Sequence, residues 1–225
     1  MIVSISQPTL FSWIGYYNII KNSDVFVFLD NVKFKKRDWH MRNRLKMIGD
    51  KESWTWISIP TKSINENTMI KDAQIDNSKN WIKKHQKTFE NLYGKNYTKI
   101  NFLTKMYEKN WEFLADFNIE FIRNCCDYLD IKTTLKKASD LRVTGKKSEL
   151  LLNICEEIGA TKYLTSVGAR DYLEKDKKTF ENADIEIMYH NYKHPIYKQR
   201  GNQFIENLSI LDLLFNELEN SKNFV

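Results

Sequence analysis

Two stretches near the start of the chain carry the residue types best suited to chemistry. Asp30 ends the apolar run "DVFVFLD", where a partly desolvated carboxylate suits a general base. Alternatively, it pairs with Arg42 or Arg44. Residues 33–46, "KFKKRDWHMRNRLK", form a basic segment with interspersed aromatic residues. Within this segment His40 is placed for proton transfer, although a surface-loop histidine without a catalytic role is the more common case.

The basic segment also predicts a site for an anion. Its run Arg42-Asn43-Arg44 can hold a phosphate or carboxylate through charge-assisted, bidentate hydrogen bonds. Ahead of it, Gln7 offers donor and acceptor atoms at a buried strand end, which suits either a sugar hydroxyl or the neighbouring backbone. Trp13 and Tyr16 supply flat apolar surface for a base or a sugar ring. Together these residues predict an anion-binding edge.

Three later stretches add candidates for substrate binding. In "VTGKKSELL" Lys147 lies at the start of a predicted helix, where backbone amides and the helix dipole favour an anion. The turn "TSVGARDYL" presents Ser166 and Gly168, either as a ligand edge or as an ordinary turn. Tyr197 and Gln199 alternate along an extended stretch, so we expect them on opposite sides unless a bulge intervenes, with one lining the site.

The elements that must position these side chains begin with two buried strands. The runs "IVSIS" (2–6) and "DVFVFLD" (24–30) are rich in β-branched or aromatic residues, and a helical pattern at 13–23 joins them. A helix between two buried strands predicts a βαβ unit in a parallel sheet. Such sheets bind ligands beyond the carboxyl ends of their strands. We further expect a third strand at 53–60 and a short partner at 69–75.

The rest of the chain predicts helices followed by renewed αβ alternation. From 77 to 130, apolar and aromatic residues recur three and four apart, which predicts a helical insertion whose first helix ends at Gly94. Ser148 is the expected cap of a later helix that Gly159 terminates. The remaining elements, a helix, two strands and a closing helix, are expected at 149–159, 161–166, 183–190 and 208–218.

Composition narrows the class of protein. Of the 225 residues, 42% are hydrophobic and 13% aromatic, which indicates a globular chain, and no linker rich in Pro, Gly or Ser divides it. We therefore expect one α/β domain over residues 1–225, with a mainly parallel, Rossmann-like sheet. No apolar run approaches the roughly 20 residues of a membrane span, and the start lacks a signal-peptide pattern, so a cytoplasmic location is expected.

Charge and metal-binding patterns exclude further classes. The net charge is +6, and lysine and asparagine are abundant along the whole chain. Nucleic acid is therefore a minor interpretation beside a small anionic ligand. The three cysteines have no metal-ligand spacing, and Cys125 and Cys126 are adjacent. His190 and His194 flank a predicted strand end, which makes them a poor metal pair. We expect no metal site.

Four separated motifs resemble one family. They are "QPTLFSWIGYYNIIKNSDVFVFLDNVKFKKRDWHMRNRL", "KKSELLLNICEEIGATKYLTSVGARDYL", "PIYKQ" at 195–199 and "NLSILDLLFN" at 207–216. In this order they resemble the signature of the WbqC-like family, over nearly the entire chain. Members of that family are found among bacterial genes for O-antigen and other surface polysaccharides, and aminoacyl transfer to a sugar has been proposed for some.

The resemblance implies an enzyme of O-antigen or capsule synthesis that transfers an acyl or aminoacyl group to a nucleotide-linked amino-sugar. Asp30 or His40 would act as base, and the partners would be the nucleotide-linked sugar and an activated acyl donor. The cofactor stays open between an acyl donor and ATP. One alternative is an ATP-dependent ligase or nucleotidyl transfer. Nucleotidyltransferase-like sheets offer an analogy, but Trp13 and Tyr16 stand where their histidines would grip triphosphate. Another alternative is a non-catalytic module that binds nucleic acid or acidic polysaccharide.

Overall fold

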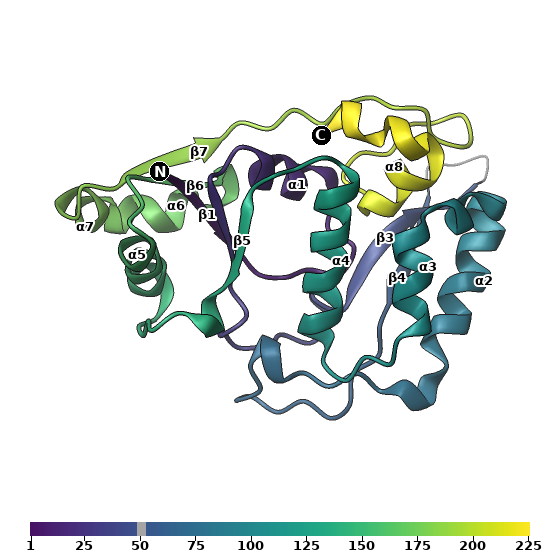
Figure 1. Cartoon of the computed structure of the whole chain (residues 1–225), viewed down its shortest axis with the longest axis horizontal. Helices are drawn as coiled ribbons and strands as arrows, with labels where there is room; N and C mark the ends of the chain where they lie inside the picture. Colours follow the sequence, from purple (N-terminus) through teal and green to yellow (C-terminus); the bar gives the residue numbers. More distant parts are fainter. Residues whose placement is uncertain (49–52) are drawn as a thin grey trace.

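The computed structural model describes residues 1–48 and 53–225 and is built around a five-stranded parallel sheet (Figure 1). The strand order is β5-β2-β1-β6-β7, and every neighbouring pair is parallel. The chain moves outward from the central β1 through β2 to β5, then crosses back to β6 and β7. The strands are β1 (Ile2–Ser6), β2 (Val25–Phe28), β5 (Thr134–Lys137), β6 (Lys162–Ser166) and β7 (Glu186–His190). The predicted α/β class is confirmed.

Helices cover both faces of the sheet, so its central strands are buried on both sides. Phe26 and Phe28 of β2 face a core that includes α1 (Ile14–Lys21), α4 (Leu114–Tyr128) and α8 (Ile210–Glu217), whereas Val25 and Val27 face a second core. The helices of the second core are α5 (Lys147–Ile158), α6 (Arg170–Leu173) and α7 (Lys177–Asn182). This double burial explains why β2 is an uninterrupted apolar run.

The predicted helical stretch from 77 to 130 contains α2 (Trp81–Tyr93), α3 (Asn101–Glu108) and α4, which pack on one side of the sheet (Figure 1). Gly94 ends α2 with a φ of +64°, and Gly159 ends α5 with a φ of +76°. Both glycines adopt the left-handed region that L-residues avoid, as expected. The predicted cap Ser148 is wrong, because α5 begins one residue earlier and the Ser148 hydroxyl donates to Asp176 instead.

A two-stranded antiparallel ribbon lies apart from the main sheet. It pairs β3 (Arg42–Lys46) with β4 (Trp54–Ser58), which is the strand predicted at 53–60. The sequence analysis expected no strand where β3 lies. The partner strand expected at 69–75 is wrong: a single 3₁₀ turn, Ile70–Asp72, occupies that stretch, flanked by isolated bridges. The ribbon turns Asn43, Leu45 and Ile57 inward, and all three are buried.

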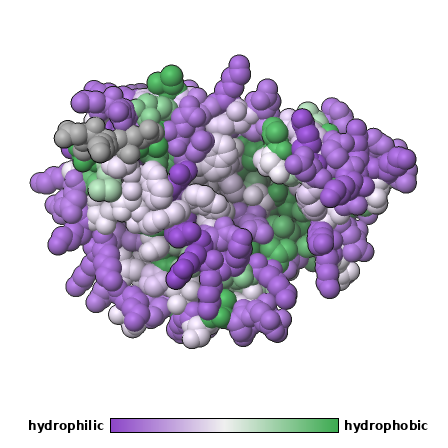
Figure 2. Space-filling view, turned by 180° about the vertical axis from the view of Figure 1, so that it is seen from behind, coloured by the Kyte–Doolittle hydropathy of each residue, from purple (hydrophilic) through white to green (hydrophobic). Residues whose placement is uncertain are grey.

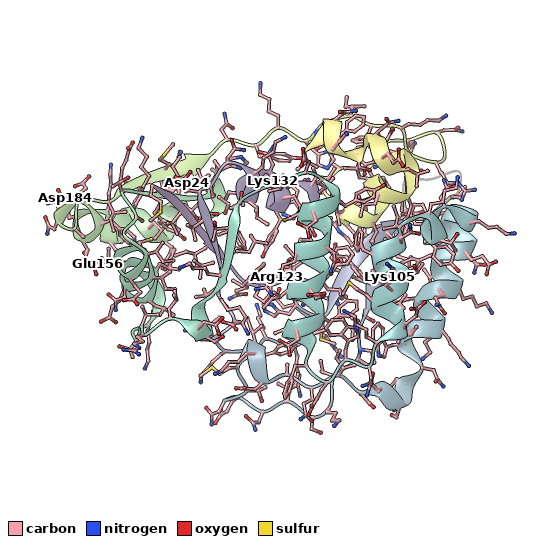
Figure 3. All side chains as sticks on the ribbon, viewed as in Figure 1. Asp24, Lys105, Arg123, Lys132, Glu156 and Asp184 are labelled. Carbon is pink, nitrogen blue, oxygen red and sulfur yellow. The ribbon has the colours of Figure 1, made fainter. Side chains whose placement is uncertain are left out.

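Charged side chains project from many sides of the molecule (Figure 3). Lys105 on α3 and Glu156 on α5 both lie on exposed helix faces, far apart on opposite halves of the fold. Among the described residues, no helix combines the length and apolarity that crossing a membrane requires.

His85 makes the stability of this fold dependent on pH. Its Nε2 donates to the Ser58 carbonyl and its Nδ1 accepts from the Tyr107 hydroxyl, both at 2.9 Å. Burial lowers the pKa of His85 to about 4. Between pH 6.5 and pH 4, His85 is therefore protonated in the unfolded chain but neutral in the folded chain. We expect the free energy of unfolding to fall by about 3 kcal/mol from pH 7 to pH 4 through this group.

Urea unfolding at a series of pH values measures this effect. His85→Gln keeps one donor and one acceptor but does not titrate, so its stability should depend less on pH between 4 and 6.5. His194→Gln, at a half-buried position, serves as the comparison. An unchanged pH dependence in His85→Gln would contradict this assignment.

Candidate functional site

A cavity of about 470 Å³ opens beyond the carboxyl ends of β1 and β6, where the strand order reverses. Open parallel sheets bind ligands at this point. Seen from behind, it is a hollow with hydrophobic side chains at its base (Figure 2). Its lining comes from the strand ends, α1 and the segment after β7: Ser4, Ile5, Ser6, Trp13, Gly15, Tyr16, Ile19, Phe26, Thr165, Ser166, Val167, Gly168, His190, Asn191 and Tyr192.

A second cavity, of about 420 Å³, adjoins the first, because Ser6, Trp13 and Tyr16 line both. Its remaining lining residues are Thr9, Trp39, Asn43, Arg44 and Asn207. We refer to the two cavities together as the switch-point cleft. The first cavity contains His190 and the second contains Arg44, with Trp13 common to both.

Trp13 is fixed by its neighbours on α1 and on the segment after β7. A Cβ atom on Gly15 would lie 2.3 Å from the Trp13 ring, so the ring packs directly against the glycine. Its edge contacts Tyr192, with ring centres 5.2 Å apart. Gly15 therefore makes room for an aromatic wall of the cleft.

Tyr16 holds the turn that leads into α1. It is buried, and its hydroxyl donates to the Gln7 carbonyl at 3.0 Å. Burial raises the pKa of Tyr16 well above its usual value, so the hydroxyl stays protonated and remains a donor. The Gln7 side chain is not among the groups that line either cavity.

Arg44 supplies the cationic group of the cleft. Its Nη2 donates to the Asn207 carbonyl at 3.2 Å, and its guanidinium carbon lies 5.5 Å from the Trp39 ring centre. The ring of Trp54 is at 5.3 Å. The Arg44 Nε is buried and has no hydrogen-bond partner within residues 1–48 and 53–225. Because an unpaired buried donor is costly, an acceptor atom from a ligand would be stabilised there.

Asn43 also lines the cleft, but its side chain already forms hydrogen bonds with the protein backbone. Its Nδ2 donates to the carbonyls of Leu10 and Phe11 at 2.9 and 3.0 Å, and its Oδ1 accepts from the Arg44 amide at 2.8 Å. The side chain therefore ties the ribbon to the turn after β1. Its side-chain atoms are engaged by the backbone, so its role is to position Arg44 and not to bind a ligand directly.

His190 is a cleft residue that sequence reasoning missed. It ends β7, and its Nε2 lies 2.8 Å from Asn18 Oδ1, which also accepts from Asn22. Nε2 therefore carries the proton of the neutral ring, and Nδ1 has the free lone pair. Burial lowers the pKa of His190 below its ordinary value, so the neutral ring predominates at pH 7. Its position at a strand end was the available signal.

The structure brings six of the predicted binding residues to the cleft: Trp13, Tyr16, Asn43, Arg44, Ser166 and Gly168. They come from three parts of the sequence that the sheet topology gathers at one edge. A family model described as the WbqC-like protein family matches residues 7–224, a span that includes all six. The chain belongs to the WbqC-like protein family.

The chain is also similar to one individual protein along nearly its whole length. This WbqC-like chain is 31% identical over 220 residues to the uncharacterized protein Rv1507c of Mycobacterium tuberculosis, across 95% of this chain and 93% of that protein. No solved structure matches the chain.

Asp30 of this WbqC-like protein has a structural partner. It is buried, and its carboxylate accepts from the Ser139 amide at 2.9 Å and from the Ser139 hydroxyl at 2.6 Å. Among the described residues no ion pair joins it to Arg42 or Arg44, so the expected pairing is wrong. It does not line the cleft, and its role as a base stays a prediction.

His40 is a buried residue, so the surface-loop alternative is wrong. It is 2% exposed, its ring packs on Phe34, and burial lowers its pKa. Its Nδ1 has no partner within the part of the chain that the structure describes. His40 is not among the cleft-lining residues, so catalysis by His40 also stays a prediction.

Tyr197 and Gln199 belong to a buried network, and the expectation that they face opposite sides is wrong. Gln199 Nε2 donates to the Tyr197 hydroxyl at 3.0 Å, and that hydroxyl donates to Asp212 at 2.7 Å. Tyr93 donates to the other oxygen of Asp212 at 2.7 Å. Tyr197 and Gln199 do not line the cleft.

Arg42 and Lys147 also lie outside the cleft lining. The Arg42 guanidinium carbon stacks 4.0 Å from the Trp56 ring centre on the outer face of the ribbon. Lys147 is exposed at the first residue of α5, on the other half of the molecule. The three cysteines are buried thiols whose pKa burial raises. No group of three or more potential metal ligands occurs among the described residues.

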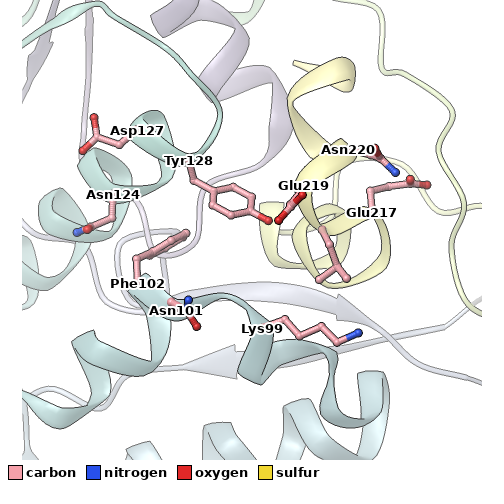
Figure 4. Close-up of a pocket in the computed structure, with 10 residues that line it drawn as sticks. Lys99, Asn101, Phe102, Asn124, Asp127, Tyr128, Glu217, Glu219 and Asn220 are labelled. Atoms are coloured by element: carbon pink, nitrogen blue, oxygen red, sulfur yellow. The ribbon is translucent and has the colours of Figure 1, made fainter.

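A separate cavity of about 610 Å³ lies between α3, α4 and the C-terminal turns. Figure 4 shows Tyr128 and Glu219 pointing toward one another across it, and Glu219 adds to the effect of burial in raising the pKa of Tyr128. Asp127 and Glu217 add further carboxylates, with Lys99 as the cation. It contains none of the predicted site residues and lies away from the sheet edge.

Asp30→Asn separates a structural role from a catalytic one. The amide loses one acceptor for Ser139, so we expect the free energy of unfolding to fall by about 1–3 kcal/mol in urea unfolding. Ser139→Ala, which removes only the hydroxyl donor, should show a smaller loss. Unchanged stability of Asp30→Asn together with lost activity would assign Asp30 to catalysis.

Proposed function

We propose that this WbqC-like protein transfers an acyl or aminoacyl group to the amino-sugar of a nucleotide-linked sugar, in surface-polysaccharide synthesis. The observation that carries the proposal is the switch-point cleft itself, with Arg44 in one cavity and a neutral His190 in the other. The polysaccharide context follows from the bacterial surface-polysaccharide genes among which members of the family are found.

The Arg44 cavity suits the phosphates of the nucleotide. Arg44 is its cationic side chain. Its Nη2 donates to the Asn207 carbonyl, whereas its Nε has no partner among the described residues and can donate to a phosphate oxygen. The N-terminus of α1 begins at Ile14, next to Trp13, which lines both cavities, so the positive end of the helix dipole adds to the attraction. The Trp39 ring offers apolar surface to the nucleoside.

The His190 cavity suits the sugar. Ser6, Thr165 and Ser166 line it with hydroxyl groups, and Asn191 adds an amide. Hydroxyl and amide groups pair with the donors and acceptors of a sugar ring. The Trp13 wall packs against the apolar face of the ring.

Acyl transfer to an amine needs a group that accepts a proton. A bond forms between the sugar nitrogen and the acyl carbon, and the bond from that carbon to its leaving group breaks. The nitrogen loses a proton as it attacks, and the His190 Nδ1 lone pair receives it. Asn18 holds the imidazole in the required tautomer through Nε2, and the proton then passes to the leaving group.

Arg44→Ala tests the binding half of the proposal. At a hundred times its dissociation constant, a nucleotide-linked amino-sugar should add about 2.7 kcal/mol of stability to the wild-type protein, seen as a thermal shift. We expect Arg44→Ala to weaken the affinity by roughly ten- to a hundredfold, because a charge-assisted hydrogen bond is lost. Arg42→Ala, on the outer face of the ribbon, is the matched control and should bind as the wild type does.

The same screen distinguishes the alternatives. Stabilisation only by ATP with magnesium would favour a ligase or nucleotidyl transfer. If no small molecule stabilises the protein and it binds polyanions in a salt-sensitive way, both enzyme interpretations are excluded.

His190→Gln tests the catalytic half. The variant keeps an amide donor toward Asn18 but cannot accept a proton, so amide formation should slow by roughly 10²–10⁴-fold while nucleotide-sugar affinity is retained. Mass spectrometry of the sugar product after incubation with activated acyl donors measures the rate. Wild-type rates should fall in acid as His190 becomes protonated, and this dependence should vanish in the variant. Equal rates in both proteins would exclude His190 as the base.

A further inference from the structure

Exposed hydrophobic side chains gather on the ribbon and on the turn before it. Of the nine large hydrophobic side chains that are exposed among the described residues, five lie here, each between 39% and 48% exposed: Trp39, Met47, Ile48, Trp54 and Trp56. We call these five the ribbon patch. In the space-filling view, hydrophobic residues, coloured green, lie at the upper left of the molecule, at the end where the ribbon lies (Figure 2). Soluble proteins rarely leave such a cluster without a partner.

The ribbon patch is surrounded by positive charge. Residues 33–58 carry eight lysines and arginines against three acidic residues, so this segment contributes nearly the whole net charge of +6. Lys33, Lys35, Lys36 and Arg37 are exposed on the turn that precedes the ribbon. Arg42 stacks on Trp56 at 4.0 Å, so that its stem covers apolar surface while its N–H groups remain available.

The chemistry of the patch fits lipid better than a sugar chain or a nucleic acid. Base or sugar stacking uses open aromatic faces, but Arg42 covers one face of Trp56, and Trp54 meets Trp56 edge-on at 78°. Met47 and Ile48 offer aliphatic chains, which stack neither bases nor sugars. Aliphatic tips, tryptophans and basic residues together are the composition of a membrane-interface anchor.

We propose that the ribbon patch docks this protein on the surface of an anionic lipid bilayer. Met47 and Ile48 enter the boundary between headgroups and acyl chains, and the three tryptophans lie at headgroup level. Arg42 and the exposed lysines contact lipid phosphates and add electrostatic attraction to the membrane surface. Trp39 also lines the Arg44 cavity, so docking brings the opening of the switch-point cleft close to the membrane.

Vesicle binding by the full chain tests the proposal. Vesicles of phosphatidylethanolamine and phosphatidylglycerol should co-sediment the protein, and vesicles of phosphatidylcholine alone should bind it far less. Lipids brominated in the acyl chain should quench its tryptophan fluorescence. The double variant Met47→Ser/Ile48→Ser should bind vesicles at least roughly tenfold more weakly than the wild type, because it lacks the aliphatic side chains that insert into the bilayer.

Matched variants keep the test specific. Ile196→Ser removes an aliphatic side chain that is 80% exposed elsewhere, and it should bind vesicles as the wild type does. Lys35→Gln/Lys36→Gln should weaken binding by roughly tenfold, whereas Lys175→Gln/Lys178→Gln, near α7, should have little effect. Thermal unfolding of each variant confirms that it is folded.

Two results would overturn the proposal. One is equal vesicle binding by Met47→Ser/Ile48→Ser and the wild type. The other is binding to single-stranded DNA or an acidic polysaccharide through the same lysines, without quenching by brominated lipid, which would assign the surface to a soluble polyanion.

Discussion

Two buried side-chain amides hold the turn that follows β1, and the shape of the cleft depends on them. Asn43 donates to the carbonyls of Leu10 and Phe11, while Asn118 of α4 donates to the Pro8 carbonyl and to one in the basic segment. These carbonyls lie outside the sheet ladder, and the two side-chain amides supply hydrogen-bond donors for them. Phe11 has a φ of +46°, a strained conformation that persists because its surroundings fix it. The amides thus supply rigidity where a nucleotide-binding loop would use glycine.

The buried carboxylate of Asp212 fixes the long segment between β7 and α8, because it accepts hydrogen bonds from Tyr93 and from Tyr197 of that segment. Burial raises the pKa of Asp212, whereas the hydroxyls of Tyr93 and Tyr197 and the charge of Lys46 act in the opposite direction. The Lys46 ammonium also donates to the Gln203 carbonyl. The segment therefore has fixed anchors although it contains no helix or strand. Through this network Tyr197 and Gln199 of the motif "PIYKQ" have a structural role.

The sequence predicted those features that follow from local physics. β1 and β2 read as apolar runs because both of their faces are buried, and Gly94 and Gly159 mark helix ends because only glycine is comfortable there. β5 was missed, since Leu135 is the one apolar residue of "TLKK" and the strand lies at the sheet edge. α7 was missed as well, because only Phe180 of its six residues is buried. His190 was considered only as a metal ligand, and judged a poor one, because only the tertiary fold reveals which strand ends meet.

The ribbon divides its tasks between two faces of one strand. Asn43 and Leu45 point into the core, while Arg42 and Arg44 point outward, as the twofold period of a strand requires. Inserting or deleting one residue within β3 would exchange the two sets, burying guanidinium groups and exposing the amide that holds the β1 turn. Length variation among relatives should therefore be excluded from residues 42–46, even where the side chains themselves diverge. In this strand, substitutions are tolerated more readily than insertions or deletions.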